Sequence, residues 1–265
     1  MIKQISSINN PLVRQWLALK EKSRSRKRTG LFLIEGYREI SLAIKGGYSI
    51  ETIIFNSDLI TKDEIANLNV ESAEIIEVTS ELYQRLAYRE STQGIIAVSR
   101  SRKLSLNRLK IENSNPIVLV AEAPEKPGNI GALLRTADAA NVDAVIIANP
   151  KTDLYNPNII RSSVGCVFTN QIAVGSTLEV INFLKTKNIS ILCAALDQSA
   201  KYHEQDYTKA TAIVVGTEAT GLSNEWLQNS TQNVMIPMQG EIDSLNVSVA
   251  AGILIFEAKR QRDFK

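Results

Sequence analysis

Histidine and cysteine are scarce in this chain. Its 265 residues include one histidine, His203, and two cysteines, Cys166 and Cys193. Two thiols so far apart in sequence form neither a disulfide framework nor a zinc knuckle. A lone histidine without a Gly-x-Ser-x-Gly turn gives no hydrolytic triad. We therefore expect a protein without a metal site, and a reducing compartment, the cytoplasm, is the simplest location.

Long hydrophobic runs and strong net charge are also absent from the sequence. No apolar run approaches the roughly 18 residues of a membrane span, so no membrane association is expected. The net charge is +2, from 30 basic and 28 acidic residues, which neither requires nor excludes nucleic acid. The basic residues are unevenly distributed, however, and one short segment gathers Lys20, Lys22, Arg24, Arg26, Lys27 and Arg28.

The first hundred residues alternate short apolar strands with helical patterns. Asn10 followed by Pro11 is typical of a helix start, with Asn10 as the N-cap. Strands are predicted at 31–34, 50–55, 75–78 and 94–98, with helices between them. This pattern predicts a small α/β domain over residues 1–98, followed by a polar, basic linker over residues 99–115.

After Pro116 the pattern becomes more regular. Apolar strands are predicted at 117–121, 144–148, 189–196, 212–216 and 234–236, and helices at 130–140, 176–185 and 246–262. Continuous apolar strands that alternate with helices are typical of a mostly parallel sheet covered on both faces. The sequence therefore predicts a second α/β domain over residues 116–265.

Three loops that follow predicted strands carry unusual residues, and ligands of α/β sheets bind at the carboxyl ends of strands. The first loop begins at Glu122 and turns into a helix at a glycine-rich stretch, with Arg135 one helical turn further on. The stretch is neither a G-x-G-x-x-G fingerprint nor a Walker A motif. Taken alone, this loop is better explained by a solvated arginine on a helix surface.

The second and third loops are also open to two interpretations. In the second, Gly216 and Gly221 surround Glu218, and the structural alternative is a simple turn. The third is a long polar loop that ends at Ser244 and Asn246, and here the alternative is a pair of caps for the closing helix.

Taken together, these loops resemble the three ordered motifs of the SpoU (TrmH) family of RNA ribose 2′-O-methyltransferases. The matching motifs are Asn129-x-Gly131-x-x-x-Arg135-Thr136, Gly216-x-Glu218-x-x-Gly221-Leu222, and Ile236-Pro237-Met238 leading to Ser244-Leu245-Asn246-Val247-Ser248. The N-terminal half resembles the RNA-substrate-binding domain of that family, through Asn10-Pro11, Phe32 with Glu35-Gly36, and Thr92-Gln93-Gly94. Ala219, where many members have glycine, and Asp243, before Ser244, depart from the pattern.

The resemblance implies a fold and a set of site residues. It implies an L30e-like N-terminal domain, a C-terminal SPOUT domain with a deep trefoil knot, and a homodimer in which motif-one residues reach the partner's cofactor site. Residues expected to hold S-adenosylmethionine (SAM) are Leu196, Gly216, Thr217, Gly221, Ile236, Met238 and Leu245. Residues expected at the reaction centre are Asn129, Arg135, Glu218, Ser244 and Asn246. Residues expected to contact RNA are Arg24, Arg26, Lys27, Arg28 and Glu35.

The implied reaction transfers the activated methyl group of SAM to a ribose 2′-hydroxyl. Arg135 is the candidate base, although arginine side chains normally stay protonated. Two versions remain open: Arg135 loses its proton in a special site, or it stays charged, stabilises the alkoxide and grips a phosphate.

Several functions compete with methylation of 23S rRNA, the target that we expect. Within the same family they are a tRNA methyltransferase or an antibiotic-resistance rRNA methyltransferase. An inactive RNA-binding factor would keep the fold without the reaction, but the presence of Asn129, Arg135, Glu218 and Asn246 argues against it. A nucleotide-dependent oxidoreductase lacks its glycine fingerprint.

Overall fold

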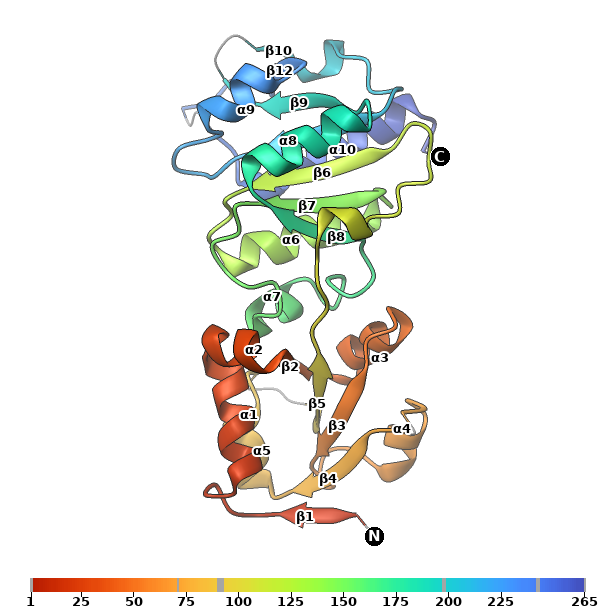
Figure 1. Ribbon diagram of the computed structural model, residues 1–265, viewed down its shortest axis with the longest axis vertical. Helices are drawn as coiled ribbons and strands as arrows, with labels where there is room; N and C mark the ends of the chain where they lie inside the picture. Colours follow the sequence, from red (N-terminus) through yellow and green to blue (C-terminus); the bar gives the residue numbers. More distant parts are fainter. Residues whose placement is uncertain (1, 71, 90–92, 197–198, 242–243, 265) are drawn as a thin grey trace. The chain divides into compact units, whose positions relative to one another are not determined.

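The computed structural model describes residues 2–70, 72–89, 93–196, 199–241 and 244–264. The chain divides into two compact units (Figure 1). The N-terminal unit comprises Met1–Lys103 together with Asp153–Thr169, and the C-terminal unit comprises Leu104–Thr152 and Asn170–Lys265. A segment from the second half of the chain therefore belongs to the N-terminal unit, an arrangement that strand and helix patterns do not indicate.

The N-terminal unit contains a five-stranded mixed sheet in the order β1-β4-β3-β5-β2. Its strands are β1 (Lys3–Ile5), β2 (Leu31–Glu35), β3 (Ile50–Phe55), β4 (Glu74–Val78) and β5 (Ile95–Arg100). Its helices are α1 (Pro11–Glu21), α2 (Ser23–Thr29), α3 (Tyr37–Lys45), α4 (Lys62–Ala66), α5 (Ser80–Leu86) and α7 (Pro157–Ser162). Strand β5 is antiparallel to both of its neighbours, β2 and β3.

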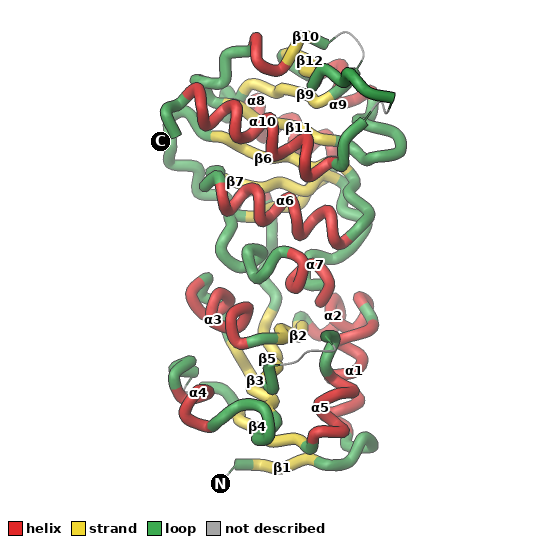
Figure 2. Tube along the Cα trace, turned by 180° about the vertical axis from the view of Figure 1, so that it is seen from behind, coloured by secondary structure: helices red, strands yellow, loops and turns green. Residues whose placement is uncertain are grey.

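Helix α1 shows how the sequence positions these elements. The Asn10 side chain accepts a hydrogen bond from the Leu12 backbone N–H, and Pro11 occupies the first turn, as expected. The apolar face of α1 buries Val13, Trp16 and Leu19 in one core with α5 and the sheet. Helices α3 and α4 lie on the side of the sheet opposite α1 and α5 (Figures 1 and 2).

The segment Asp153–Thr169 is held in the N-terminal unit by buried contacts. The Tyr155 ring stacks on the Phe32 ring with a centroid distance of 4.4 Å. The Phe168 ring also stacks on Phe32, with a centroid distance of 6.0 Å. The Asp153 carboxylate pairs with the guanidinium of Arg26, with an Nη2–Oδ2 distance of 2.7 Å. The unit is therefore completed by residues that lie far along the chain from the rest of it.

The C-terminal unit contains a seven-stranded sheet in the order β10-β12-β9-β11-β6-β7-β8, parallel throughout the described residues. Its strands are β6 (Ile117–Glu122), β7 (Ala144–Ala148), β8 (Ile172–Gly175), β9 (Ser190–Ala194), β10 (Ala200–Lys201), β11 (Thr211–Val215) and β12 (Gln232–Met235). Its helices are α6 (Pro127–Ala139), α8 (Thr177–Thr186), α9 (Asn224–Asn229) and α10 (Val247–Gln261), with 3₁₀ turns at Leu106–Arg108 and Tyr202–Glu204. The predicted mostly parallel α/β sheet is confirmed.

Helices cover both faces of this sheet. Helices α8 and α9 lie on the face seen in Figure 1, where Val180, Leu184 and Trp226 join a buried core with the strands. Helices α6 and α10 lie on the face seen in Figure 2 and pack against each other. In the described residues, no helix has both the length and the apolar character needed to cross a membrane.

Candidate functional site

A cavity of about 440 Å³ opens in the C-terminal unit, where strands β9, β11 and β12 end. This volume lies within the range of about 300–1,000 Å³ that is typical of small-molecule pockets. Its lining combines apolar side chains with the polar backbone of two loops. Every residue expected to hold the cofactor lines it: Leu196, Gly216, Thr217, Gly221, Ile236, Met238 and Leu245.

The loop after β11 needs glycine at two positions. A Cβ on Gly216 would lie 2.2 Å from the carbonyl carbon of Gly221, a distance that real side chains do not reach. Gly221 has a φ of +66°, in the left-handed region that favours glycine. Thr217 and Gly221 exchange two backbone hydrogen bonds of 3.0 Å, which close the loop into a tight turn. The turn leaves polar backbone atoms along one wall of the cavity.

A polar cluster joins the three motif loops at the edge of this cavity. The Asn246 side chain donates from Nδ2 to Glu218 Oε1 at 2.7 Å and to Asn129 Oδ1 at 3.3 Å. Lys126 donates from Nζ to the other carboxylate oxygen of Glu218 at 2.9 Å. Asn246 also caps α10, because its Oδ1 accepts from the Ser248 backbone N–H at 3.0 Å. The cap and the site contact are therefore both made by one side chain.

Charge pairing sets the protonation of this cluster. The hydrogen bond from Lys126 lowers the pKa of the Glu218 carboxyl below its ordinary value of 4.5, and the same contact raises the pKa of Lys126. Glu218 is therefore an ionised hydrogen-bond acceptor at neutral pH. Lys126, which the sequence reasoning missed, is the residue before Pro127 at the start of α6. The signal for this pair would have been a lysine in the first motif loop together with a glutamate, Glu218, in the second.

Two of the expected reaction-centre residues lie differently from this cluster. Ser244 lines the cavity. Arg135 is exposed on α6 and is not among the residues that line the cavity of its own chain. A single chain thus brings together Asn129, Glu218 and Asn246 and places Ser244 in the cavity wall, whereas Arg135 does not line that cavity. Asp243, next to Ser244, lies outside the described residues.

A buried carboxylate anchors the second motif loop, and the sequence reasoning also missed its role. Glu122, at the end of β6, is 6% exposed. Its oxygens accept hydrogen bonds from the backbone N–H and the hydroxyl of Ser223, both at 2.8 Å, and from the Thr177 hydroxyl at 3.1 Å. Three donors satisfy the buried group and fix the point where the glycine loop ends.

Comparisons with known proteins identify the family. The model of the SpoU rRNA Methylase family matches residues 116–256, and that of the MRM3-like substrate binding domain matches residues 10–97. The chain is 31% identical to the 23S rRNA (uridine(2479)-2'-O)-methyltransferase of Streptomyces viridochromogenes, covering 96% of this chain and 91% of the relative. It is 28% identical to the 23S rRNA (guanosine(2553)-2'-O)-methyltransferase RlmP of Bacillus subtilis, covering 97% and 100%.

The chain belongs to the SpoU rRNA methylase family. Solved structures agree: a crystal structure of an RNA 2'-O ribose methyltransferase has 36% identity and a TM-score of 0.84, covering 98% of this chain and 99% of the other. The Streptomyces viridochromogenes SpoU methyltransferase AviRb, solved with AdoMet, has 30% identity and a TM-score of 0.88, covering 96% and 99%. The predicted family, SAM cofactor and RNA 2′-O-methyltransferase activity are confirmed.

In this SpoU-family chain, the residues expected to contact RNA occupy two different environments. Arg24, Lys27 and Arg28 are exposed on α2. Arg26 is buried, with 5% of its surface exposed, and donates to both carboxylate oxygens of Asp153 and to the Leu19 carbonyl. The burial of the Arg26 guanidinium and its pairing with Asp153 argue against an RNA contact for this residue.

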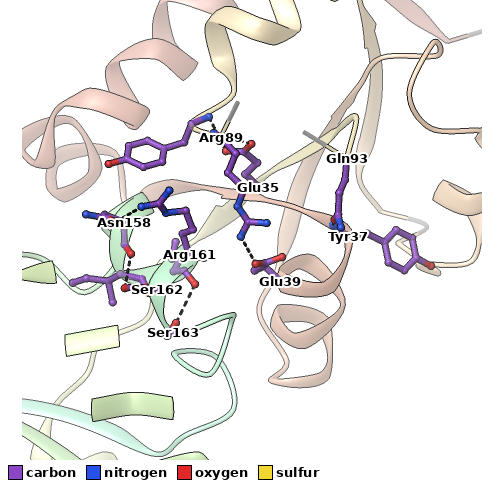
Figure 3. A network of polar contacts seen from close by, with 12 residues as sticks. Glu35, Tyr37, Glu39, Arg89, Gln93, Asn158, Arg161, Ser162 and Ser163 are labelled. Atoms are coloured by element: carbon purple, nitrogen blue, oxygen red, sulfur yellow. Dashed lines mark hydrogen bonds and ion pairs between the residues drawn. The ribbon is translucent and has the colours of Figure 1, made fainter. Parts of the chain in front are cut away.

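Glu35 holds a loop in place. Its two carboxylate oxygens accept hydrogen bonds from the backbone N–H groups of Tyr88 at 2.7 Å and Arg89 at 3.2 Å. Burial raises the pKa of Glu35, and these two hydrogen bonds oppose that effect. The Arg89 side chain pairs with buried Glu39, and Arg161 of α7 lies beside this network (Figure 3). Thr92, part of the expected motif in this loop, lies outside the described residues.

Proposed function

We propose that this SpoU-family enzyme methylates a ribose 2′-hydroxyl of 23S rRNA. The observation that carries the proposal is the polar cluster of Asn129, Glu218 and Asn246 at the edge of a cavity of about 440 Å³. A cofactor in the cavity and a ribose at the cluster would meet at that edge. The target class follows from the relatives, which are named as 23S rRNA 2′-O-methyltransferases.

SAM fits the lining of this cavity. When bound, it supplies a methyl group on a positively charged sulfur. A side chain on Gly216 would collide with the backbone of Gly221, so glycine at this position lets the loop close and keeps its polar backbone along the cavity wall. The apolar side chains of Ile236, Met238 and Leu245 complete the lining. In this proposal these residues hold the cofactor and exclude water from it.

The chain's own polar residues would orient the nucleophile. Glu218 is an ionised acceptor, so it can receive the hydrogen bond of a ribose hydroxyl. Asn246 holds the Glu218 carboxylate from one side and Lys126 holds it from the other, which fixes its direction. Asn129, linked to Asn246, offers a further amide beside the same point.

Arg135 enters the site, in this proposal, from the second subunit of a homodimer. Val249 and Phe256 of α10 are 50% and 43% exposed, and with Gly252 and Ile253 they form an apolar stripe at positions i, i+3, i+4 and i+7. Such a stripe suits an interface between copies. Gly252 lies against Thr136, the neighbour of Arg135 on α6, which supports a position of Arg135 near the proposed interface. Guanidinium groups stay charged in proteins, so Arg135 would grip a phosphate and stabilise the negative charge that develops on the 2′-oxygen while its proton passes to the Glu218 carboxylate.

The same proposal includes the finer features of the family. These are an L30e-like RNA-binding domain over residues 1–98, a linker over 99–115, and a SPOUT domain over 116–265 with a deep trefoil knot, of which the segment Asp153–Thr169 packs within the N-terminal unit. A cytoplasmic location fits an enzyme that acts on ribosomal RNA. Exposed Arg24, Lys27 and Arg28 support an RNA-backbone contact on α2.

The test is methyl transfer from radiolabelled SAM to purified RNAs. We expect label in 23S rRNA transcripts, recovered as a 2′-O-methylnucleoside after complete digestion, and none in tRNA. Glu218→Gln should reduce the single-turnover rate at saturating SAM, while the melting temperature falls only slightly because the lost ion pair with Lys126 is exposed. Label in tRNA alone would replace the proposed target, and label on a base would contradict the proposed reaction.

A further inference from the structure

An exposed aromatic ring and a guanidinium lie together on the N-terminal unit. Tyr88, which follows α5, is 43% exposed, and the Arg161 Cζ atom lies 5.3 Å from the centroid of its ring. Both residues belong to this unit, although Arg161 comes from the α7 segment. Arginine at this distance from a tyrosine ring is a cation–π arrangement. Nothing in the proposed methyl transfer uses this pair.

Both members of the pair are held in place from behind. The Tyr88 backbone N–H donates to Glu35 Oε2 at 2.7 Å, which fixes the start of the loop. Arg161 Nη2 donates to Asn158 Oδ1 at 3.3 Å within α7 (Figure 3). A ligand that binds a surface ordered in advance loses less conformational entropy. The Tyr88 backbone and the Arg161 guanidinium are thus restrained, and the Tyr88 ring is exposed beside them.

The surroundings favour a flat, weakly polar ligand attached to negative charge. A hollow of about 20 Å³ beside the pair has an apolar floor made of Leu33, Leu86, Ile96, Pro157 and Ile160. A volume of this size admits one water molecule, so a larger ligand would lie on the ring rather than inside the hollow. Lys20 donates from Nζ to the Ala87 carbonyl at 2.6 Å, so the basic run that leads to α2 starts next to Tyr88.

We propose that Tyr88 and Arg161 form a stacking platform for an unpaired nucleobase of the RNA substrate. The inference rests on the proposed function, because it assigns a subsite for the same RNA. Bases in a duplex are stacked on each other and unavailable, whereas splayed bases of loops and bulges stack on aromatic rings and arginine planes. The α7 segment, which lies in the methylase half of the sequence, would thereby supply part of the RNA-binding surface.

The experiment measures stacking and affinity on the full-length protein. The probe is a single-stranded RNA of about 12 nucleotides, within the site sizes of single-strand binders, that carries one 2-aminopurine. The same strand paired into a duplex is the comparison. Tyr88→Leu keeps the apolar bulk but removes the ring, Tyr88→Phe keeps the ring, and Arg161→Ala removes the guanidinium. Arg14→Ala, which removes an exposed arginine of the same unit, is the matched control.

We expect the wild type to quench 2-aminopurine fluorescence in the single strand. Tyr88→Leu should abolish this quenching and weaken single-strand binding about 5- to 150-fold, the range for loss of one aromatic–base stack. Duplex affinity should stay within about twofold, and Tyr88→Phe should bind like the wild type. Arg161→Ala should weaken binding and lower the salt slope by about 0.7, whereas Arg14→Ala should leave quenching intact.

Two results would overturn the platform. One is single-strand affinity and quenching unchanged in Tyr88→Leu, and the other is an equal loss on single strand and duplex. Methyl transfer measured in parallel separates this outcome from failure of the proposed function. An enzyme that methylates 23S rRNA without quenching the probe refutes only the platform, whereas quenching without methylation of any RNA refutes only the proposed reaction.

Discussion

Removing Asp153 should destabilise the N-terminal unit strongly. Arg26 and Asp153 side chains are 5% and 10% exposed, and the carboxylate accepts from Nε at 3.0 Å and from Nη2 at 2.7 Å. Asp153→Ala leaves a buried guanidinium with two unpaired donors. Breaking one partner of a buried pair costs about 3–5 kcal/mol. For a chain of this size we expect the melting temperature to fall by roughly 6–20 °C.

The assay is thermal unfolding followed by circular dichroism, with two comparison variants. Lys27→Ala removes an exposed neighbour on the same helix and should shift the stability by less than about 0.5 kcal/mol. The double variant Arg26→Met with Asp153→Leu should be less destabilised than Asp153→Ala, because an apolar pair avoids the unpaired charge. RNA binding of the double variant should keep the wild-type salt slope. If Asp153→Ala melts like Lys27→Ala, the pair is not the buried contact described above.

Three further predictions concern the C-terminal unit. Gly216→Ala should abolish SAM binding measured by calorimetry, because its Cβ would lie 2.2 Å from the Gly221 backbone; binding at wild-type affinity would contradict the proposed use of that loop. Lys126→Met removes the hydrogen bond that lowers the Glu218 pKa, so this carboxyl should titrate closer to its ordinary 4.5. In the wild type, the stability that ionised Glu218 contributes is present above 4.5 and is lost as the pH falls through the lowered folded pKa, so acid titration of melting temperature should show a smaller loss in the variant. Arg135→Ala should lower the single-turnover rate about 10²–10³-fold, as for loss of a charge-stabilising donor, with unchanged melting. Mixing Arg135→Ala with Gly216→Ala subunits should then restore activity, and no restoration would place Arg135 in the site of its own chain.

Local patterns predicted much of the fold. Helix α3 and strands β3 and β7 lie where the sequence patterns predicted them, because α3 has one buried face and the two strands are short, mostly apolar runs. The edge strands β1 and β10 were missed. They have three and two residues, which are too few to show an alternation of apolar and polar side chains. The basic run was expected as a charged segment, yet it forms α2, whose Arg26 turns inward to Asp153. A contact between residues so far apart in sequence has no local signal.

The sequence predicted those site residues whose positions depend on the local geometry of their own loop. Gly216 and Asn246 fall in the cavity wall and the polar cluster because turn and cap geometry place them locally. Lys126 and Glu122 were missed, since each acts on a residue from a distant loop that only the folded sheet brings near. The expected RNA contact of Glu35 stays a prediction, and the role of its two oxygens as acceptors for the Tyr88 and Arg89 backbone N–H groups had no local signal in the sequence.

The most direct test of the central claim is a map of 2′-O-methylation across total RNA. The map compares cells that make this protein, cells that lack it, and cells that carry Glu218→Gln. The proposed function predicts that one or a few ribose methylations in 23S rRNA disappear without the protein, return with the wild type, and return weakly with the variant. A 23S rRNA map that is identical in all three would contradict it.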